Sequence, residues 1–326
     1  MLFSLAITGP TASGKTALSL ALAEALSAEI ISSDSMQIYR YMNIGTAKAT
    51  PEEQKRVRHH LIDFLPPDTD YSVESYREDA LAAARDVSAR GKLPLFVGGT
   101  GLYVDSLTRG SAAETPESDP EYRTRILKSL KSDEDVTALW ERLNAVDPES
   151  AEKIHKNNVK RVIRALEIYD KTGKPKSLLD KESVKGEPEI FVGMITLDFH
   201  SRDTLYERID RRVDIMLREG LLDEVRGLLD GGYLKDGTAA QAIGYKELIA
   251  YFDGRITLDS AAEEIKLASR RYAKRQLTWF RHERDAKTLY MDGEDGKMRP
   301  LEEIIDEAMR LAEEFRLEYE AKKGIE

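Results

Sequence analysis

The strongest chemical signal in the sequence is the glycine-rich segment Gly9–Thr16, which reads GPTASGKT. It matches the pattern G-x-x-x-x-G-K-[ST] in full, between an apolar run and a segment of helical periodicity, as the pattern requires. Glycines let such a loop curl so that backbone N–H groups point inward, and the start of the helix adds partial positive charge. We predict a di- or triphosphate site, with Lys15 on terminal phosphates, Mg²⁺ as cofactor and the Thr16 hydroxyl as the metal ligand.

A second polar group, Asp34-Ser35-Met36-Gln37, follows the apolar run Glu29–Ser33. If that run is a parallel strand, Asp34 lies at the carboxyl edge of the sheet, where the sites of α/β proteins form. The residues alone leave its role open between a general base, a helix N-cap and indirect support of Mg²⁺. A third apolar run, Leu93–Val97, ends in Gly98-Gly99-Thr100-Gly101 and not in the metal-holding aspartate of a typical P-loop NTPase. The pattern therefore indicates phosphate binding without indicating ATP hydrolysis.

The elements that must position these residues alternate between strand and helix. Leu2–Thr8 and the two later apolar runs are typical of buried parallel strands, and helical periodicity covers the segment after the loop and Ser75–Arg90. From about Ala113 to Gly186 no strand is predicted, and Ile190–Leu197 and Thr288–Met291 then return to strand chemistry. We predict an α/β fold: a P-loop parallel sheet flanked by helices, with an all-helical insertion domain. The core domain comprises residues 1–112 and 187–326, and the insertion 113–186.

Within the insertion, Asp147-Pro148 is a strong helix start, and Asn158 can cap a further helix. That helix has apolar residues on one face and Lys160, Arg161 and Arg164 on the other. The segment Thr172–Pro188 contains two glycines and two prolines, which predicts a linker.

Composition excludes several classes of protein. The chain has 326 residues, a formal net charge of −10 and no cysteine. The absence of cysteine excludes disulfide scaffolds, thiolate metal sites and cysteine nucleophiles. No apolar run approaches the ~20 residues of a membrane-spanning helix, and the N-terminus does not resemble a signal peptide. We therefore expect a cytoplasmic protein that does not contact membranes.

An acidic protein can bind nucleic acid only through local basic patches, and the sequence has two. Residues 153–176 carry eight Lys and Arg against two acidic residues, and 270–287 carry seven against two. The first patch lies in the insertion, which favours an arm that binds phosphates. The second includes Tyr272, Trp279 and Phe280, which could stack on bases or pack in the core, and core packing is the preferred interpretation for Trp279 and Phe280.

Together these pieces resemble the tRNA dimethylallyltransferase (tRNA isopentenyltransferase) family. The resemblance covers about residues 1–285, in the family's order. Its segments are GPTASGKT (9–16), SSDSMQIYRYMNIGTAKAT (32–50), HHLIDF (59–64), VGGTGLYVDSL (97–107), NNVKRVIRALEIY (157–169), YERIDRRVDIMLREGLLDEV (206–225), QAIGYKEL (241–248) and RQLTWFR (275–281). Two loop positions depart from the family pattern, since Ala49 and Arg58 stand where proline is usual.

The resemblance implies transfer of a dimethylallyl group from its diphosphate to N6 of adenosine 37, beside the anticodon of tRNAs that read codons beginning with U. It implies Asp34 as general base, with catalytic roles for Lys15, Thr16, Thr100 and Arg212. The diphosphate site would comprise Gly9, Thr11, Ala12, Ser13, Gly14, Lys15, Thr16 and Arg212, with Arg208 as the alternative arginine. His59 would have a supporting or purely structural role.

The resemblance also implies the tRNA-binding residues and the partners. The tRNA contacts would be Asp34, Ser35, Met36, Gln37, Thr100, Arg123, Lys160, Arg161, Val162, Ile163, Arg164, Gln241, Gly244 and Lys246. The partners would be the anticodon stem-loop of tRNA and dimethylallyl diphosphate, bound by a monomer. The target base must leave the stack of the anticodon loop to reach a buried pocket.

Three other functions share the phosphate loop. A small-molecule kinase leaves the DSMQ segment and the basic insertion unexplained. A prenyltransferase acting on free AMP, ADP or ATP needs no basic insertion. A regulatory NTPase switch needs an aspartate at the end of the apolar strand.

Overall fold

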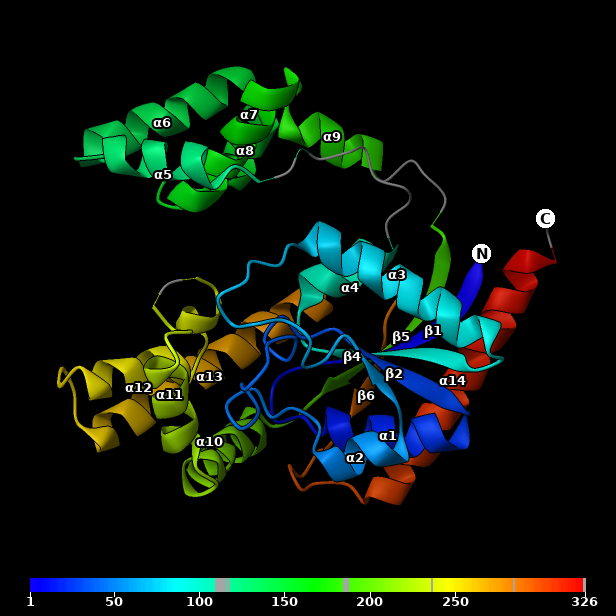
Figure 1. Cartoon of the computed structure of the whole chain (residues 1–326). Helices are drawn as coiled ribbons and strands as arrows, with labels where there is room; N and C mark the ends of the chain where they lie inside the picture. The colour runs from blue at the N-terminus through cyan, green and yellow to red at the C-terminus, as the bar shows by residue number, and fades with distance from the viewer. Residues whose placement is uncertain (109–115, 117, 184–187, 236, 284, 325–326) are drawn as a thin grey trace. The chain divides into compact units, whose positions relative to one another are not determined.

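The computed structural model describes residues 1–108, 116, 118–183, 188–235, 237–283 and 285–324 (Figure 1). Their contacts divide the chain into two compact units, a core unit of Met1–Thr108 and Ile190–Glu326 and a helical unit of Arg109–Glu189. The core unit contains one parallel sheet of order β3-β2-β4-β1-β5-β6. Its strands are β1 (Leu2–Thr8), β2 (Ala28–Ser32), β3 (His59–His60), β4 (Leu93–Gly98), β5 (Ile190–Asp198) and β6 (Lys287–Tyr290). The sequence prediction of a parallel α/β sheet is thus confirmed.

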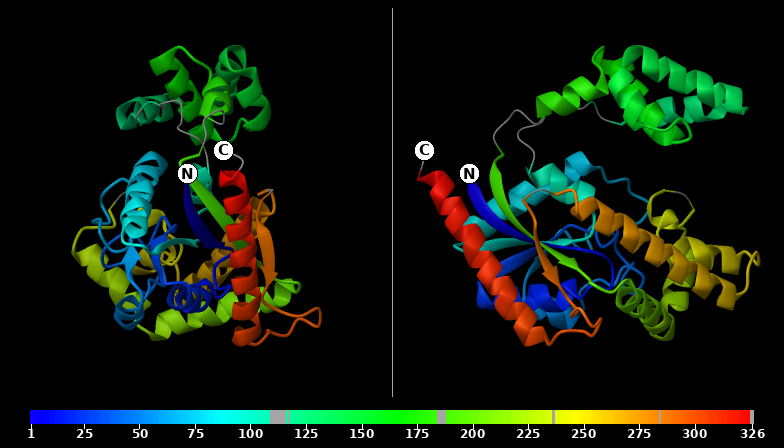
Figure 2. Two further views of the ribbon diagram at one scale, coloured as in Figure 1. Left: turned by 90° about the vertical axis from the view of Figure 1, so that its right-hand side faces the viewer. Right: turned by 180° about the vertical axis from the view of Figure 1, so that it is seen from behind.

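The strands form a sheet buried on both faces because their apolar side chains alternate between two cores. Leu5 and Ile7 of β1 pack in one cluster with α1 and α14, whereas Ala6 packs in the other with α3 and α4. Figure 2 shows α3 and α14 on opposite sides of the strands. The helices of the core unit are α1 (Lys15–Ala25), α2 (Pro51–Arg56), α3 (Val73–Ala89), α4 (Gly101–Thr108), α10 (Arg202–Arg218), α11 (Leu221–Asp230), α12 (Tyr245–Phe252), α13 (Leu258–Phe280) and α14 (Leu301–Lys323), with a 3₁₀ turn η1 (Ala239–Gln241).

Helices α10 to α13 form a third apolar cluster of the core unit, together with the loop after β2. Tyr39 and Met42 of that loop pack there beside Val225 of α11 and Leu248 of α12. The loop at the carboxyl end of β2 therefore packs against helices from a distant part of the chain. His59, on the short edge strand β3, pairs with Ile30, and its Nδ1 lies 2.8 Å from the carbonyl oxygen of Val57. This contact favours the structural role for His59.

The described part of the helical unit contains helices and no strand, as predicted. They are α5 (Pro120–Ser129), α6 (Asp133–Val146), α7 (Pro148–Lys153), α8 (Val159–Thr172) and α9 (Lys176–Ser183). Asp147 caps α7 by accepting the N–H of Ser150 at 3.1 Å. Asn158 precedes α8 but makes no side-chain cap.

The prediction of a linker over Thr172–Pro188 is wrong for Lys176–Ser183, which forms α9. Gly173 ends α8 in a left-handed conformation, with φ of 69°, and Pro175 lies just before the next helix. The glycine thus ends one helix, and the proline precedes the start of the next. Asp147 accepts from both the N–H and the hydroxyl of Ser177, at 3.0 and 2.6 Å, and ties the start of α9 to α7.

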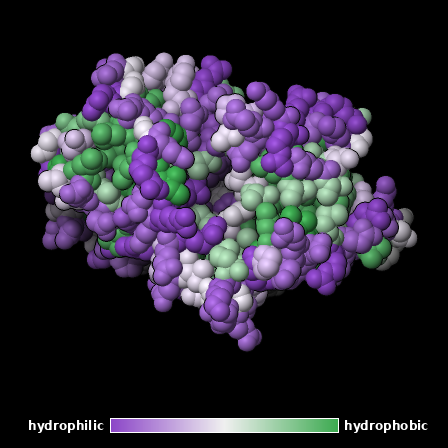
Figure 3. All heavy atoms as spheres, turned by 90° about the horizontal axis from the view of Figure 1, so that it is seen from below, coloured by the Kyte–Doolittle hydropathy of each residue, from purple (hydrophilic) through white to green (hydrophobic). Residues whose placement is uncertain are grey.

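The surface carries both polar and apolar areas. Hydrophilic side chains cover most of the face drawn in Figure 3, and apolar side chains gather in two separate areas of it. No described helix has the length and the hydropathy needed to cross a membrane.

Candidate active site

The loop Gly9–Thr16 connects β1 to α1 and has the curled backbone that its sequence predicts. Gly9 and Gly14 have φ of 138° and 98°, and Ala12 has φ of 61°. A side chain on Gly9 would lie 2.8 Å from the carbonyl oxygen of Leu197, so β5 packs directly against the loop. The first N–H groups of α1 have no intrahelical partner, which makes its N-terminus a site for an anion.

Lys15 turns back over this loop. Its Nζ donates to the carbonyl oxygens of Gly9 at 3.0 Å and Pro10 at 2.7 Å. Burial, followed by the nearby Arg212 guanidinium, lowers the pKa of Lys15 from 10.5 to about 7, and Asp34 acts in the opposite direction. A negatively charged ligand beside Lys15 would restore its protonation, so the site favours an anion.

Two arginines of α10 approach the loop in different ways. Arg208 donates from Nε to the carbonyl oxygen of Ala12 at 2.9 Å and thereby supports the loop backbone. Arg212 has no hydrogen bond or ion pair within the described residues. Burial lowers its pKa, Asp34 acts in the opposite direction, and Arg208 lowers the pKa further. The geometry favours Arg212 over Arg208 as the arginine available to a ligand.

Asp34 lies just after β2, at the same edge of the sheet as the loop. Its Oδ1 accepts from the N–H of Met36 at 2.9 Å, and its Oδ2 has no hydrogen-bond partner in the part of the chain that the structure describes. Thr100, after β4, accepts from the N–H of Ser35 at 3.0 Å and donates to its hydroxyl at 3.3 Å. The predicted residues Asp34, Ser35, Met36 and Thr100 therefore lie together, each partly exposed.

Two tyrosines lie near Asp34, and the sequence analysis assigns neither of them to this site. Burial, followed by the Asp34 carboxylate, raises the pKa of Tyr272 on α13 to about 12, while hydrogen bonding with Thr100 and Gln276 acts in the opposite direction. Burial also raises the pKa of Tyr103 on α4, with smaller effects of Tyr39 and Asp34. Both hydroxyls thus remain protonated beside the carboxylate.

Gln276 of α13 joins the two glycine-rich segments. Its Oε1 accepts from the N–H of Thr11 at 2.9 Å, and its Nε2 donates to the carbonyl oxygen of Gly99 at 2.9 Å. A side chain on Gly99 would lie 2.1 Å from Nε2, so this contact requires glycine there. Gln276 lies within the RQLTWFR segment, which is the signal that a closer reading of the sequence would have used.

The two aromatic residues that follow Gln276 differ in burial. Phe280 is only 2% exposed and packs in the core, as preferred above. Trp279 is 37% exposed, and its Nε1 donates to Asp105 at 3.1 Å. Its indole covers Gly101, where a side chain would lie 2.4 Å from the ring. The preference for core packing therefore holds for Phe280 and only in part for Trp279.

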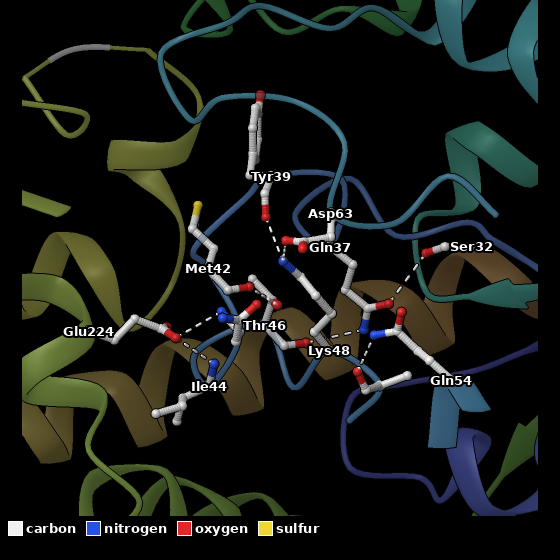
Figure 4. A network of polar contacts seen from close by, with 12 residues as sticks. Ser32, Gln37, Tyr39, Met42, Ile44, Thr46, Lys48, Gln54, Asp63 and Glu224 are labelled. Atoms are coloured by element: carbon white, nitrogen blue, oxygen red, sulfur yellow. Dashed lines mark hydrogen bonds and ion pairs between the residues drawn. The ribbon is translucent and has the colours of Figure 1, made fainter. Parts of the chain in front are cut away.

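Gln37 is occupied within the loop that follows β2, residues 34–48, which we call the 34–48 loop. Its Nε2 donates to the carbonyl oxygens of Thr46 at 3.2 Å and Ala47 at 3.3 Å, and its Oε1 accepts from Ser32 at 3.3 Å (Figure 4). Gln37 thus stabilises the loop. Because its amide already makes three hydrogen bonds within the protein, it has fewer donors and acceptors available for a nucleobase than the resemblance implies.

The tip of the 34–48 loop is held by Glu224 of α11. The carboxylate accepts the N–H groups of Asn43, Ile44 and Gly45 at 2.8, 2.8 and 3.1 Å, as Figure 4 shows for Ile44. Glu224 also accepts from the hydroxyl of Tyr245 on α12 at 2.7 Å. One carboxylate therefore connects this loop to two helices more than 170 residues away in sequence.

The segment from η1 to α12 carries the predicted residues Gln241, Gly244 and Lys246. Gln241 and Lys246 are exposed. Gly244 is buried, with φ of 94°, and its N–H donates to Glu247 at 2.8 Å. Because Tyr245 binds Glu224, this segment and the 34–48 loop form one connected structure.

The residues present fit a magnesium ion that is held largely by substrate phosphates. The Thr16 hydroxyl is exposed at the N-terminus of α1, with no partner in the described chain. The hydroxyl of Ser13 is the one buried side-chain polar atom without a hydrogen bond among the described residues. No cluster of three metal-binding side chains occurs among them. Mg²⁺ commonly takes few protein ligands and completes its shell with phosphates and water.

β4 ends at Gly98, as the sequence analysis predicts, but an aspartate closes a different strand beside the loop. β5 pairs with β1 and ends at Asp198, one residue beyond the predicted strand. The carboxylate is bound by Arg202 at 2.8 Å and by Arg281 at 3.1 Å. Asp198 is thus neutralised by arginines, unlike an aspartate that holds a metal ion.

In the helical unit, α8 exposes some of the predicted tRNA-binding residues and buries others. Lys160 and Arg161 are exposed. Val162 and Ile163 are each 1% exposed, so their side chains belong to the core of the unit. Arg164 and Arg123 both bind the buried carboxylate of Glu167, at 3.0 and 2.9 Å. The residues with free cationic groups are therefore Lys160 and Arg161.

The chain is similar to known proteins of one family. The model of the IPP transferase family matches residues 37–283, and that of isopentenyl transferase matches residues 4–65. The chain is 47% identical over 287 residues to a tRNA dimethylallyltransferase of Thermoanaerobacter sp. strain X514, covering 88% of this chain and 91% of the other. It is 52% identical over 280 residues to that of Geobacillus thermodenitrificans, with 85% and 87% covered.

Solved structures with the same fold include a tRNA isopentenylpyrophosphate transferase from Staphylococcus epidermidis. It is 40% identical, with a TM-score of 0.68, covering 96% of this chain and 99% of the other. A eukaryotic dimethylallyltransferase acting on tRNA is 30% identical, with a TM-score of 0.75, covering 89% and 74%.

Proposed function

Because the chain belongs to the tRNA dimethylallyltransferase family, and is a prenyltransferase that acts on tRNA, we propose its exact reaction. It transfers the dimethylallyl group of dimethylallyl diphosphate to N6 of adenosine 37, in tRNAs that read codons beginning with U. The products are N6-dimethylallyladenosine and diphosphate. One observation carries the proposal. Two cations that form no ion pair with a carboxylate of the described residues, Lys15 and Arg212, lie near Asp34 at one edge of the sheet.

The diphosphate of the donor binds at the loop Gly9–Thr16. Lys15, Arg212 and the N–H groups at the start of α1 offset the charge that grows on the diphosphate as the carbon–oxygen bond breaks. Thr16 and the phosphates would hold Mg²⁺, which supplies further charge neutralisation when bound. Gln276 and Arg208 support this chemistry from outside by fixing the loop backbone.

The acceptor amine is a poor nucleophile because its lone pair is delocalised into the purine. As the carbon–nitrogen bond forms, N6 must lose a proton, and Oδ2 of Asp34 is available to take it. Ser35, Met36 and Thr100 surround this carboxylate and would line the pocket for the base. The adenine enters after leaving the stack of the anticodon loop.

The remaining tRNA is bound by residues outside this pocket. In the core unit these are Gln241 and Lys246, with the backbone at Gly244. In the helical unit, whose tRNA-binding role is part of the proposal, they are Lys160 and Arg161. We expect the enzyme to act as a monomer, since each group assigned to the chemistry belongs to the core unit of one chain. We also expect it to act in the cytoplasm.

The test supplies labelled dimethylallyl diphosphate and Mg²⁺ with tRNA, with AMP or with neither, in the absence of ATP. Label should enter only tRNA, and nucleoside analysis should locate it on N6 of adenosine 37. Transfer to AMP would support an adenylate prenyltransferase, and a requirement for ATP would make the loop a nucleotide site. A tRNA carrying guanosine at position 37 is the matched control.

A further inference from the structure

An aromatic pair joins the 34–48 loop to the segment after α11: the exposed Tyr41 and the partly buried Tyr233, which packs against the apolar cluster of α10 to α13. Tyr41 is 54% exposed, although its neighbours Tyr39 and Met42 are fully buried. The rings of Tyr41 and Tyr233 have centroids 5.6 Å apart and an interplanar angle of 36°. Neither hydroxyl has a hydrogen-bond partner in the described chain. Tyr41 therefore presents aromatic surface to solvent, and Tyr233 supports it from the side of the core.

The backbone at Tyr41 makes this display unusual. Its φ is 67°, in the left-handed region that glycine adopts freely and that is a clear outlier for a bulky residue. Burial of the ring does not explain why a tyrosine is kept there, because most of the residue remains exposed. Strained residues of this kind persist where the surrounding structure over-determines them, commonly at binding sites.

The surrounding loop does hold Tyr41 firmly. On one side, Lys48 donates to the carbonyl oxygen of Tyr39 at 2.6 Å, and on the other Thr46 donates to that of Met42 at 2.7 Å, both drawn in Figure 4. Glu224 fixes the next residues, from Asn43 on. Tyr41 is thus presented outward by a rigid frame.

The partner ring is also fixed, on the segment that follows α11. The N–H of Tyr233 donates to the carbonyl oxygen of Leu228 at 3.0 Å. Its ring lies against Gly231, where a side chain would lie 2.8 Å from it. Arg40 and Lys235, each exposed, place cationic side chains in the same two segments. Exposed aromatic rings flanked by cations are typical of surfaces that bind single-stranded nucleic acid.

We propose that Tyr41, supported by Tyr233, stacks on an unpaired nucleobase of the tRNA anticodon loop and so helps to select and place the substrate. This rests on the proposed function, since extraction of one base leaves its neighbours unstacked and in need of a new surface. The 34–48 loop would then contact two bases of the tRNA. Asp34, at its start, faces the reacting base, and Tyr41 stacks on a second base.

The test compares four variants of the full-length enzyme for tRNA affinity and for kcat and KM at fixed salt. Tyr41→Phe keeps the ring and should bind tRNA within about twofold of wild type. Tyr41→Leu and Tyr41→Gly remove it and should weaken tRNA binding by about tenfold or more, with the affinity for dimethylallyl diphosphate unchanged. Tyr41→Gly should also raise or preserve the melting temperature, because it relieves the backbone.

Ser27→Gly is the matched control. Ser27 is another exposed residue with positive φ, 51°, but it lies before β2, at the opposite edge of the sheet. It should preserve or raise the melting temperature like Tyr41→Gly, without loss of tRNA affinity. A loss of affinity in Tyr41→Gly together with an unchanged melting temperature separates stacking from a structural role.

Anticodon-loop RNAs with one abasic site at each position then identify the stacked base. Removal of the stacked base should weaken binding of the RNA to the wild-type enzyme. It should not change binding of the RNA to Tyr41→Leu, which has already lost the ring that stacks on that base. Unchanged tRNA affinity in Tyr41→Leu, or the same loss in both proteins at every abasic position, would overturn the inference. Failure of wild type to prenylate tRNA would instead refute the proposed function.

Discussion

Ligand binding at the loop Gly9–Thr16 should be coupled to uptake of a proton by Lys15. In the ligand-free protein, burial and Arg212 lower the pKa of Lys15 to about 7. A bound diphosphate adds negative charge beside the ammonium and moves the pKa back toward its ordinary value of 10.5. Because the pKa rises on binding, affinity is highest below pH 7 and falls as pH increases between the two values.

The size of the effect follows from the fraction of charged Lys15. With a pKa of about 7, this fraction is about one half at pH 7, one tenth at pH 8 and one hundredth at pH 9. The apparent Kd for dimethylallyl diphosphate should therefore rise about fivefold from pH 7 to 8 and about tenfold from pH 8 to 9. At pH 8, binding should take up about 0.9 proton per site.

Calorimetric titration with dimethylallyl diphosphate, in buffers of different ionisation enthalpy, measures both quantities. Above about pH 7.5 the ligand's own ionisation contributes little, since the terminal phosphate of an esterified diphosphate titrates near 6. Lys15→Met should abolish the uptake, and Arg212→Gln should reduce it by removing the repulsion that lowers the pKa of Lys15. Lys55→Met, on the surface of α2, should leave it intact. A Kd that stays constant from pH 7 to 9, or no uptake at pH 8, would refute the reasoning.

Three further predictions concern the proton acceptor, the helical unit and the 34–48 loop. Asp34→Asn should lower the single-turnover rate of prenyl transfer by ~10²–10⁴ while tRNA binding persists, and a near wild-type rate would remove Asp34 from the mechanism. Replacing Lys160 and Arg161 together with Ala should reduce the salt slope of tRNA binding by about 1.4–1.8, if each contacts one phosphate, whereas an unchanged slope would leave them as ordinary surface residues. Glu224→Ala leaves three N–H groups without their acceptor and should lower kcat/KM for tRNA by roughly 10- to 100-fold. Equal loss of dimethylallyl diphosphate binding in that variant would show general unfolding instead.

Local features of the fold and site could be read from the sequence. β1 has the predicted bounds, and the loop Gly9–Thr16 has the expected conformation, because both depend on neighbouring residues. Asp34 and Thr100 come together because parallel strands bring their carboxyl ends to one edge. The helix α9 was missed because a glycine and a proline can bound a helix as well as form a linker.

Long-range pairings could not be read in this way. The contacts of Gln276 with Thr11 and Gly99 span most of the chain, and nothing local to any of the three indicates the partner. The position of Asp198 beside the loop depends on which strand is adjacent to β1, which composition and periodicity leave undetermined. The helical pattern placed Val162 on the apolar face but did not include Ile163, and the resemblance assigned both to tRNA contact, whereas both are buried.

The route by which the chain enters and leaves the helical unit has a consequence for how such a protein can evolve. Leu107, at the end of α4, and Ile190, at the start of β5, pack in the same apolar cluster of the core unit. The core therefore keeps the two ends of the interruption together by its own packing. The entropy of closing a loop grows only slowly with its length, by about 0.6 kcal/mol for each doubling. Segments of very different size can thus be exchanged at this point with little change in the stability of the core. The surface that we propose for tRNA binding in the helical unit can therefore diversify independently of the residues assigned to the chemistry.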